Sequence, residues 1–600
     1  MALLAFAVFR VAVPVWALAV DSLRLPQWDM AKYGVSGLRL ARSLQDLDPL
    51  AFFRHLNSLD VWPPVFPILE VPAFLVAGPG YGSARGLVAL LFAAAVMAAF
   101  WCGMQSNTRW GIAVGALTAT LVATSPMAHI FATVVMLEIP GTALLLIAVG
   151  SYVRSLRSDR TQDFTVACIA ATALFFCKYN YGLIWLLPMA VNELQRSGLI
   201  STAMPHRLGA ALRRPWPAVV TGGLLLAVII ETAGPWRFAL FGREISVSSA
   251  GPLLYGLYVV FLLFRILRPR RSLEAVKLWL GNLERRARTM VLAIAVPIGL
   301  WMVVPAHAIN FVRFLVNRAE GPPVLSLDSL LFYPRAFIGE FSSSQAVGAV
   351  VLLLAALSLR RLRGSDETGR VVALALAFST IAAVAHPYKQ PRFFFITAAL
   401  VWIAGSREAI ELMARASSRA RESTQRWIAA TVAGLSLVAT ASVGVDIDRL
   451  HESHRRRTVH AATAEVLDGI TDHAVEAKSS VLLGTWNHLS PWLVEWSCLQ
   501  RRPAMEVSQV PRFATGRRHR KNIIGWLLAE RPELLMVVST SPDSSPRPGL
   551  VRETRWLDPV RRRLARDPRF RLVSREDFPD AGYRLESFEP ARTNREPVPR

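Results

Sequence analysis

The sequence is short of charged residues, and of acidic residues in particular. Only 18% of its 600 residues are Asp, Glu, Lys or Arg, and 43 acidic residues stand against 67 basic ones. A typical soluble chain carries about 25% charged residues. With 53% hydrophobic residues and a mean hydropathy of +0.36, the composition excludes an ordinary soluble globular protein.

Cysteine is scarce, and the familiar signatures of soluble enzymes are missing. Cys102, Cys168 and Cys177 lie in or at apolar segments, and only Cys498 lies in the polar C-terminal part, so the sequence implies no disulfide framework. It contains no P-loop, no Rossmann glycine run, no Cys/His metal spacing and no G-x-S-x-G motif. A cytosolic nucleotide-sugar site is therefore not expected.

Apolar runs long enough to cross a membrane are abundant. A span needs about 20 apolar residues to cross a hydrocarbon layer of about 30 Å. The first run has no basic n-region and no small-residue cleavage site, so we interpret it as a retained span rather than a signal peptide. The pattern predicts an α-helical polytopic membrane protein with about 13 transmembrane helices, at 2–20, 85–103, 111–126, 130–150, 164–177, 181–192, 216–234, 252–267, 290–306, 345–359, 371–386, 392–404 and 427–443.

Basic residues gather in alternate loops between the predicted spans, and the opposite short loops hold few. Such an excess marks cytoplasmic loops facing anionic lipid. We therefore predict a multi-pass protein of the inner (plasma) membrane with a cytoplasmic N-terminus, and with the loops 21–84 and 307–344 on the outer side. The net charge of +24 is spread over short loops rather than a soluble patch, so nucleic-acid binding is not expected.

The composition changes near residue 444, which divides a transmembrane domain (1–444) from a C-terminal part (445–600). The second part is polar and rich in Arg, yet it contains β-like apolar runs at Ser480–Gly484 and Glu533–Ser539, with helical spacing between them at Asn522–Glu530. Strand, helix and strand in this order predict a small extracytoplasmic α/β domain, followed by a disordered tail.

Two acidic residues stand at the outer ends of predicted spans. Asp29, beside Trp28, could take a proton from an incoming hydroxyl, although it could also be an ordinary interfacial carboxylate beside a belt tryptophan. Glu138 lies at membrane depth, where ionisable groups usually face a cavity, although it could also be a solvated carboxylate at a helix start. Two such acids could divide the work, one as a base and the other orienting an acceptor or holding a cation.

Basic residues accompany these acids on the same predicted face. Lys178 lies at the hinge of two apolar segments, where it could neutralise a phosphate or simply snorkel to the interface. The short outer turn His386–Phe393 breaks the positive-inside pattern with Lys389 and Arg392, and an anionic phosphate would account for that. His386 fits a structural role better than a metal ligand.

The order of these features resembles the GT-C class of integral-membrane glycosyltransferases. Within it, the branch with protein O-mannosyltransferases, the aminoarabinose transferase of lipid A and bacterial core-sugar transferases is the most similar. The resemblance covers about residues 1–405, although Met30 follows Asp29 where the family often has Glu, and Glu138 stands where Asp is common. The matching segments are Trp28-Asp29…Tyr33, Trp62-Pro-Pro…Pro67, Met136-Leu-Glu-Ile-Pro140, Lys178-Tyr…Gly182 and His386-Pro-Tyr…Pro-Arg-Phe393.

The resemblance implies an inverting glycosyltransferase. It would move a sugar from a polyprenyl-phosphate donor to a hydroxyl of a lipid, glycan or protein acceptor on the outer face of the membrane. No metal ligands are identified and a divalent cation stays open. A transporter or lipid flippase, a membrane scaffold, or a polysaccharide polymerase or ligase of the same class are the alternatives. The implied site comprises catalytic Asp29 and Glu138, donor phosphate-binding Lys178, Arg392, Lys389 and Arg335, and substrate-binding Trp28, Tyr33, Tyr388 and His386.

Overall fold

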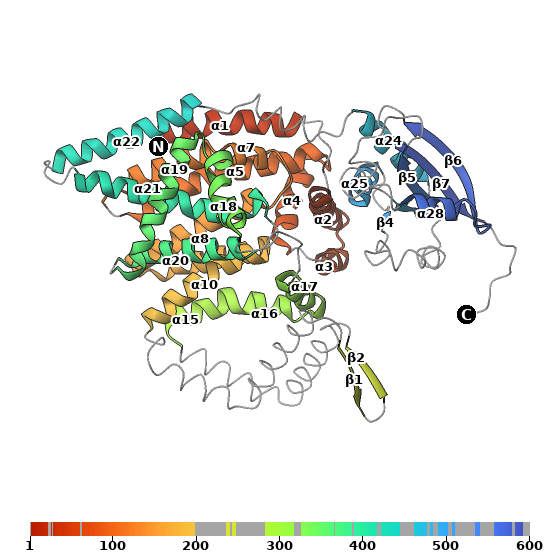
Figure 1. Cartoon of the computed structure of the whole chain (residues 1–600), viewed down its shortest axis with the longest axis horizontal. Helices are drawn as coiled ribbons and strands as arrows, with labels where there is room; N and C mark the ends of the chain where they lie inside the picture. The colour runs from red at the N-terminus through yellow and green to blue at the C-terminus, as the bar shows by residue number, and fades with distance from the viewer. Residues whose placement is uncertain are drawn as a thin grey trace.

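A computed structural model shows a helical bundle with a smaller α/β part beside it (Figure 1). The structure describes residues 2–21, 26, 28–59, 63–107, 109–197, 236–240, 243–247, 283–316, 326–364, 366–386, 389–416, 422–443, 461–476, 480–483, 490–501, 507–509, 534–540, 557–578 and 583–591.

The bundle is built from apolar helices whose buried faces form one continuous core. Six of the described helices are long and apolar enough to cross a membrane, or seven if the pair α6 and α7, bent by 63°, counts as one span. The chain is therefore an integral membrane protein. The elements of the bundle's first half are α1 (Ala2–Asp21), α2 (Trp28–Gln45), α3 (Pro49–Asn57), α4 (Val65–Ala77), α5 (Tyr81–Ser106), α6 (Gly111–Ala123), α7 (Pro126–Ala132), α8 (Glu138–Ser158), α9 (Thr161–Cys177) and α10 (Tyr179–Arg196).

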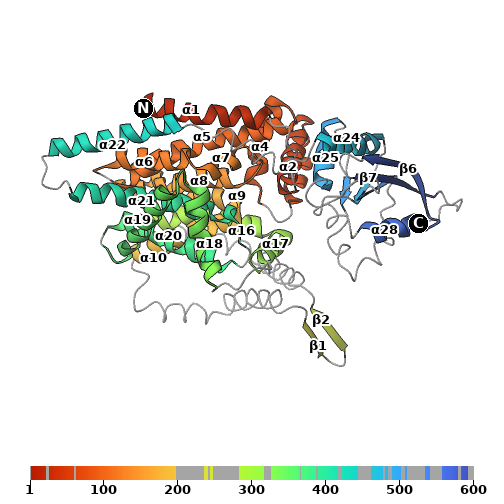
Figure 2. The ribbon, with the colours of Figure 1, turned by 45° about the horizontal axis from the view of Figure 1, so that its top comes forward.

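The second half of the bundle follows a two-stranded antiparallel ribbon of β1 and β2. Its last long helices, α21 and α22, return to the first half and pack beside α6 (Figures 1 and 2). The elements are β1 (Trp236–Leu240), β2 (Arg243–Val247), α15 (Arg285–Met290), η1 (Val291–Ala295), α16 (Val296–Met302), α17 (Pro305–Val316), α18 (Leu327–Ala336), η2 (Phe337–Phe341), α19 (Gln345–Ser358), η3 (Leu359–Arg363), α20 (Glu367–Ala385), η4 (Pro391–Phe394), α21 (Phe395–Ala416) and α22 (Glu422–Val443).

Outside the undescribed residues, each predicted span overlaps a described helix, but only six or seven of these helices are long and apolar enough to cross a membrane. The predicted span 290–306 also runs across the break between α16 and α17. The predictions at 216–234 and 252–267 lie outside the described residues, so the number thirteen stays a prediction. The predicted span 130–150 is wrong at its beginning, because the chain breaks after α7 and a new helix starts at Glu138. A helix running through Pro140 from residue 130 would lose a backbone hydrogen bond and clash with the carbonyl of Met136. A start at Glu138 instead puts Pro140 in the first turn, where it is tolerated.

The C-terminal part contains a mixed five-stranded sheet in the order β4-β3-β5-β7-β6. Strands β3, β4 and β5 run parallel, whereas β7 is antiparallel to both of its neighbours. Strands β3 and β5 confirm the two strands expected from the sequence, while the proposed boundary at residue 445 and the helix at 522–530 lie outside the described residues. The elements are α24 (Ala461–Glu476), β3 (Ser480–Leu483), α25 (Pro491–Arg501), β4 (Val507–Gln509), β5 (Leu534–Thr540), α28 (Leu557–Leu564), β6 (Phe570–Phe578) and β7 (Tyr583–Pro590).

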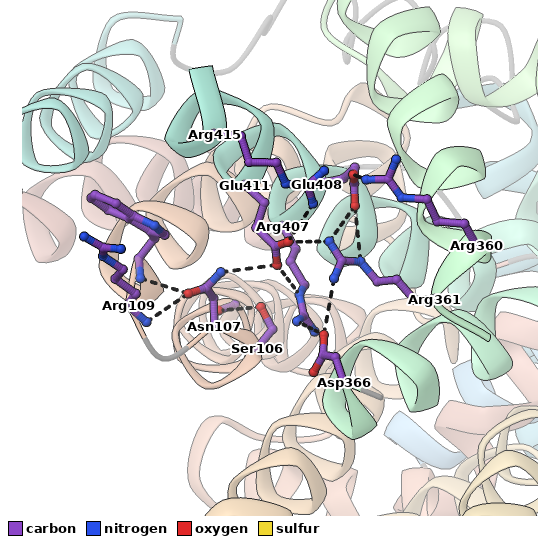
Figure 3. Close-up of polar contacts among 12 residues, drawn as sticks. Ser106, Asn107, Arg109, Arg360, Arg361, Asp366, Arg407, Glu408, Glu411 and Arg415 are labelled. Atoms are coloured by element: carbon purple, nitrogen blue, oxygen red, sulfur yellow. Dashed lines mark hydrogen bonds and ion pairs between the residues drawn. The ribbon is translucent and has the colours of Figure 1, made fainter. Parts of the chain in front are cut away.

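An ion-pair network ties η3, the N-terminal end of α20 and α21 together at one end of the bundle (Figure 3). At its centre Glu408, whose side chain is fully buried, accepts hydrogen bonds from Arg360 and Arg361. Arg407 donates to Glu411 at 2.9 Å and also pairs with Asp366. These residues come from the predicted arginine-rich loops, so the positive charge there is largely engaged in holding helix ends together.

Candidate active site

Asp29 and Arg392 lie near the beginning and near the end of the bundle's sequence, and their side chains form an ion pair. Asp29 lies in the first turn of α2, where the helix dipole favours a carboxylate. Arg392 lies in η4, the short 3₁₀ turn that leads into α21. Asp29 Oδ2 lies 3.5 Å from Arg392 Nη1, and the two side chains are 21% and 29% exposed. The pair is therefore reachable from solvent, as a proton acceptor and an anion-binding cation must be.

A second ion pair, between Glu138 and Lys178, is buried. Glu138 begins α8, and Lys178 holds an extended conformation at the break between α9 and α10. Lys178 Nζ lies 3.4 Å from Glu138 Oε1, with side-chain exposures of 6% and 0%. This burial excludes both the solvated helix-start carboxylate and the snorkelling lysine that the sequence left open.

Aromatic side chains connect the two ion pairs. Lys178 Nζ lies 3.4 Å from the hydroxyl of Tyr181 and 5.5 Å from the ring centre of Phe393. Arg392 lies over the same Phe393 ring at 5.2 Å, within electrostatic range of Glu138 as well as Asp29. Asp29, Glu138, Lys178 and Arg392 thus form one unit, which we call the charge cluster, with two positive and two negative groups.

Tyr33 borders the charge cluster from α2. It follows Asp29 by four residues, so both lie on one face of the helix. Its ring is buried and meets Phe66 edge to face at 5.6 Å. Burial, and then the negative charges of Asp29 and Glu138, raise the pKa of the Tyr33 hydroxyl well above its usual value. Tyr33 therefore stays protonated at neutral pH and can donate a hydrogen bond at the site.

Other predicted site residues make different contacts. Lys389 donates to the carbonyls of Ala383 and Val384, at 3.2 and 2.6 Å, and so caps the end of α20. His386 ends the same helix and packs against Phe393. Lys389 is thus close in sequence to Arg392 of the charge cluster, but its ammonium group binds backbone carbonyls at the end of α20.

Arg335 lies on α18 with a side chain that is 66% exposed, and its one recorded ion pair within the described residues is with the exposed Asp328, at 3.6 Å. Tyr388 lies outside the described residues, as does the side chain of Trp28, whose backbone begins α2. The roles of these three residues toward substrates stay predictions.

The charge cluster lacks the free carboxylates of a divalent-cation site. Each carboxylate already faces a basic side chain, so neither offers the free negative charge that a divalent cation requires from its oxygen ligands. Within the described ranges no three His, Cys, Asp or Glu side chains converge in a way that could hold a metal ion. The residues as arranged do not fit a resident divalent cation, and we assign no step to one.

The sequence matches no protein-family model and no curated protein. Among solved structures, the chain is similar to ArnT from Cupriavidus metallidurans bound to undecaprenyl phosphate, with 14% sequence identity, 97% of each chain covered and a TM-score of 0.50. The chain has the GT-C fold. Two further matches are the apo state of the same ArnT (13% identity, 96% of each chain, TM-score 0.48) and the oligosaccharyltransferase AglB from Archaeoglobus fulgidus with an inhibitory peptide and a dolichol phosphate (13% identity, 89% of this chain and 69% of that one, TM-score 0.46).

The GT-C fold thus confirms the resemblance inferred from the sequence motifs, as a statement about architecture.

Three residues at or near the site were not singled out from the sequence. Tyr181 and Phe393 belong to the two matching motifs, so their aromatic character beside Lys178 and Arg392 was an available signal. Glu70 is a lone acid inside the apolar helix α4, and it is fully buried against Gly37 of α2.

Proposed function

We propose that this protein is an inverting glycosyltransferase that moves a sugar from a polyprenyl-phosphate donor to an acceptor hydroxyl on the outer face of the membrane. The observation that carries the proposal is the Asp29–Arg392 pair, which sets a solvent-reachable carboxylate beside a solvent-reachable guanidinium. The GT-C fold, shared with an ArnT that binds undecaprenyl phosphate, supports a lipid-phosphate donor. The arginine-rich loops support the assignment of the site to the outer face.

In the proposed reaction, Arg392 first binds the phosphate of the donor. Its guanidinium offers two parallel N–H groups, which suit a phosphate better than a single carboxylate oxygen at 3.5 Å. As Arg392 turns toward the phosphate, Asp29 is released from its partner and faces the acceptor. Donor binding would in this way prepare the base, because the free enzyme keeps the carboxylate neutralised.

Asp29 then takes the proton of the acceptor hydroxyl while the acceptor oxygen attacks the anomeric carbon. The bond from that carbon to the phosphate oxygen breaks, its electron pair leaves with the phosphate, and the single displacement inverts the anomeric centre. The leaving phosphate gains one negative charge, so it needs charge neutralisation rather than a proton. Arg392 supplies that neutralisation directly, and Lys178 adds to it electrostatically from its buried position.

Glu138 and Tyr33 support this arrangement. Glu138 holds the Lys178 ammonium group in place at 3.4 Å. Without it, the ammonium group of Lys178, whose side chain is only 6% exposed, would be a buried charge without its carboxylate partner. Tyr33, kept protonated, donates a hydrogen bond to the acceptor or to the Asp29 carboxylate.

The test is sugar transfer from a panel of radiolabelled polyprenyl-phosphate sugars in membranes containing the wild type or Asp29→Asn. We expect the wild type to transfer label and Asp29→Asn to transfer at least about a hundredfold less, the range typical of losing a general base. Asp46→Asn, a change at the exposed far end of α2, is the matched control and should transfer normally. Equal transfer by wild type and Asp29→Asn would reject the base. No transfer by either across the panel would reject the function and favour a transporter or flippase.

A further inference from the structure

Helix α25 of the C-terminal part lies against α2, the helix that carries Asp29 (Figures 1 and 2). Polar contacts join the two along their length. Glu495, only 1% exposed, pairs with Arg39 of α2, and the carbonyl of Leu499 accepts a hydrogen bond from Arg42. Because Glu495 is buried at this contact, the two helices meet through an interior interface rather than a loose surface touch.

Trp496 of α25 packs directly on Gly34 of α2. The indole ring of Trp496 is fully buried, and a Cβ atom placed on Gly34 would overlap it. Its Nε1 donates a hydrogen bond of 2.9 Å to the carbonyl of Pro79, so the polar end of the ring is satisfied. Rings of Phe74 and Tyr81 meet it edge to face at 6.1 and 4.7 Å. Gly34 thus forms a notch in α2 that only a residue without a side chain can provide.

A second side of α2 is held by α4. Tyr33 meets Phe66 of α4, and Gly37, one turn further on, lies against Glu70. At 3.6 residues per turn, Tyr33 and Gly37 share one side of α2, Arg42 points nearly the other way, and Gly34 lies about 80° round the helix from the Tyr33–Gly37 side. Helix α2 is therefore clamped by two neighbours, α4 of the bundle and α25 of the C-terminal part, just below the turn that presents Asp29.

We propose that Trp496 is a positioning residue for the transfer reaction: seated in the Gly34 notch, it fixes the rotation and depth of α2 so that Asp29 faces Arg392. This inference rests on the proposed function, because it assigns Trp496 a role in placing the base. The Asp29–Arg392 distance of 3.5 Å is already at the long end of a hydrogen bond, so a small rotation of α2 separates the two groups. A misplacement of 1 Å can cost about a hundredfold in rate.

The principal experiment compares Trp496→Ala and Trp496→Phe with Met536→Ala in the full-length protein. Met536 is fully buried in β5, so its replacement loosens the core of the C-terminal part at a strand rather than at α25. We expect Trp496→Ala to lower kcat about a hundredfold per folded molecule, with KM for the donor changed by less than about threefold. Trp496→Phe should recover most of the rate. Met536→Ala should keep kcat per folded molecule despite a lower melting temperature.

The Asp29→Asn background separates positioning from general loss of structure. If Trp496 acts through Asp29, adding Trp496→Ala to Asp29→Asn should slow the residual transfer by less than about twofold. A further hundredfold loss would mean that Trp496 acts elsewhere, and would overturn the proposal. Full activity in Trp496→Ala alone would overturn it as well.

Enlarging the residue at position 34 and shrinking the one at position 496 gives a second, independent test. Gly34→Ala should lower kcat, because its methyl group displaces the ring of Trp496, and Trp496→Leu added to it should restore part of the lost rate by making room. Full activity in Gly34→Ala would contradict the positioning role of the contact between Trp496 and Gly34.

Hydrogen exchange of the α2 backbone gives a readout that needs no activity. It should rise in Trp496→Ala and stay as in the wild type in Met536→Ala. If the wild type transfers no sugar, the proposed function fails, while hydrogen exchange still decides whether Trp496 holds α2. If α2 exchanges equally in all three proteins, the positioning role is rejected whatever the activity.

Discussion

Asp29 and Arg392 lie 363 residues apart in the sequence, and their side chains approach to 3.5 Å at the edge of the helical bundle. One belongs to the helix that follows the first span and the other to the turn that precedes the last but one helix of the bundle. Because the two groups neutralise each other in the free protein, a bound anion has to compete with the carboxylate for the guanidinium. In the proposed reaction, this competition would link donor binding to release of the base.

Arg392→Ala should weaken binding of undecaprenyl phosphate by roughly 10- to 150-fold, the equivalent of losing a hydrogen bond to a charged group, about 1.5–3 kcal/mol. Arg392→Lys keeps the charge and loses the planar fork, so it should fall between wild type and alanine. Arg571→Ala in the C-terminal part is the control, since that side chain is 73% exposed and pairs with Glu589. Equilibrium binding of the labelled lipid measures all three. An Arg571→Ala protein that binds as weakly as Arg392→Ala would mean that the loss is not specific to Arg392.

Lys178→Met should destabilise the protein by about 3–5 kcal/mol, because it leaves the carboxylate of Glu138 buried without a counter-charge. Adding Glu138→Gln removes that charge and should restore most of the melting temperature. Transfer activity should stay low in the double variant, since the cation beside the leaving phosphate is still missing. Thermal unfolding in detergent and transfer assays on the same preparations separate the two effects. Recovery of activity together with stability would show that the pair is structural only.

Glu70 should make the stability of the protein depend on pH. Among the described residues neither of its carboxylate oxygens has a hydrogen-bond partner. Burial raises the pKa of Glu70, on a helix that is not one of the candidate spans, well above the ordinary value of 4.5. The folded state keeps the proton while the unfolded state releases it above pH 4.5, so stability is full below that pH and declines as the pH rises toward the folded-state pKa. Glu70→Gln, which cannot ionise, should flatten this part of the curve of melting temperature against pH, and an unchanged slope would contradict the assignment.

Glu408→Gln should lower the melting temperature without changing kcat per folded molecule. Glu408 is fully buried and accepts hydrogen bonds from Arg360 and Arg361, but Arg361 would keep Glu411 as a partner. The loss of the Glu408 charge should therefore cost about 1.5–3 kcal/mol, as expected for a hydrogen bond to a charged group. Arg415→Ala removes a 56% exposed member of the same network and should cost less than about 1 kcal/mol. Comparable melting temperatures for the two variants would mean that the buried residues of the network stabilise the protein no more than its exposed residues do.

The charge cluster could be predicted from the sequence because its members break local rules. Asp29, Glu138, Lys178 and Arg392 are ionisable groups at the ends of apolar segments, where charge is costly without a function. Their pairing could not be predicted, because contacts between residues 29 and 392 leave no trace in local periodicity. The role of Lys389 could not be predicted either, because charge and position alone do not distinguish a lysine that binds a ligand from one that caps a helix.

The clamping of α2 by α4 and α25 could not be predicted from the sequence, for a different reason. Gly34 and Gly37 look like weak points in a helix, and only the neighbours Trp496 and Glu70 explain why they are glycines. Trp496 lies in a part of the chain whose strands were correctly expected at 480–484 and 533–539, although nothing in those patterns indicated that α25 meets α2. The helical membrane architecture therefore followed from hydropathy, whereas the support of the site depends on tertiary packing.

The Gly34 notch has a consequence for biosynthesis. The chain emerges from its N-terminus, so α2 is complete long before its second support exists; Trp496 is made 417 residues after Pro79, whose carbonyl it binds. At about 5–20 residues per second the nascent protein spends roughly 20–80 s with the acid-bearing helix held on one side only. A product that stops short of α25 would insert into the membrane and remain inactive. For the proposed transferase, completion of the polypeptide would thus be the step at which activity first appears.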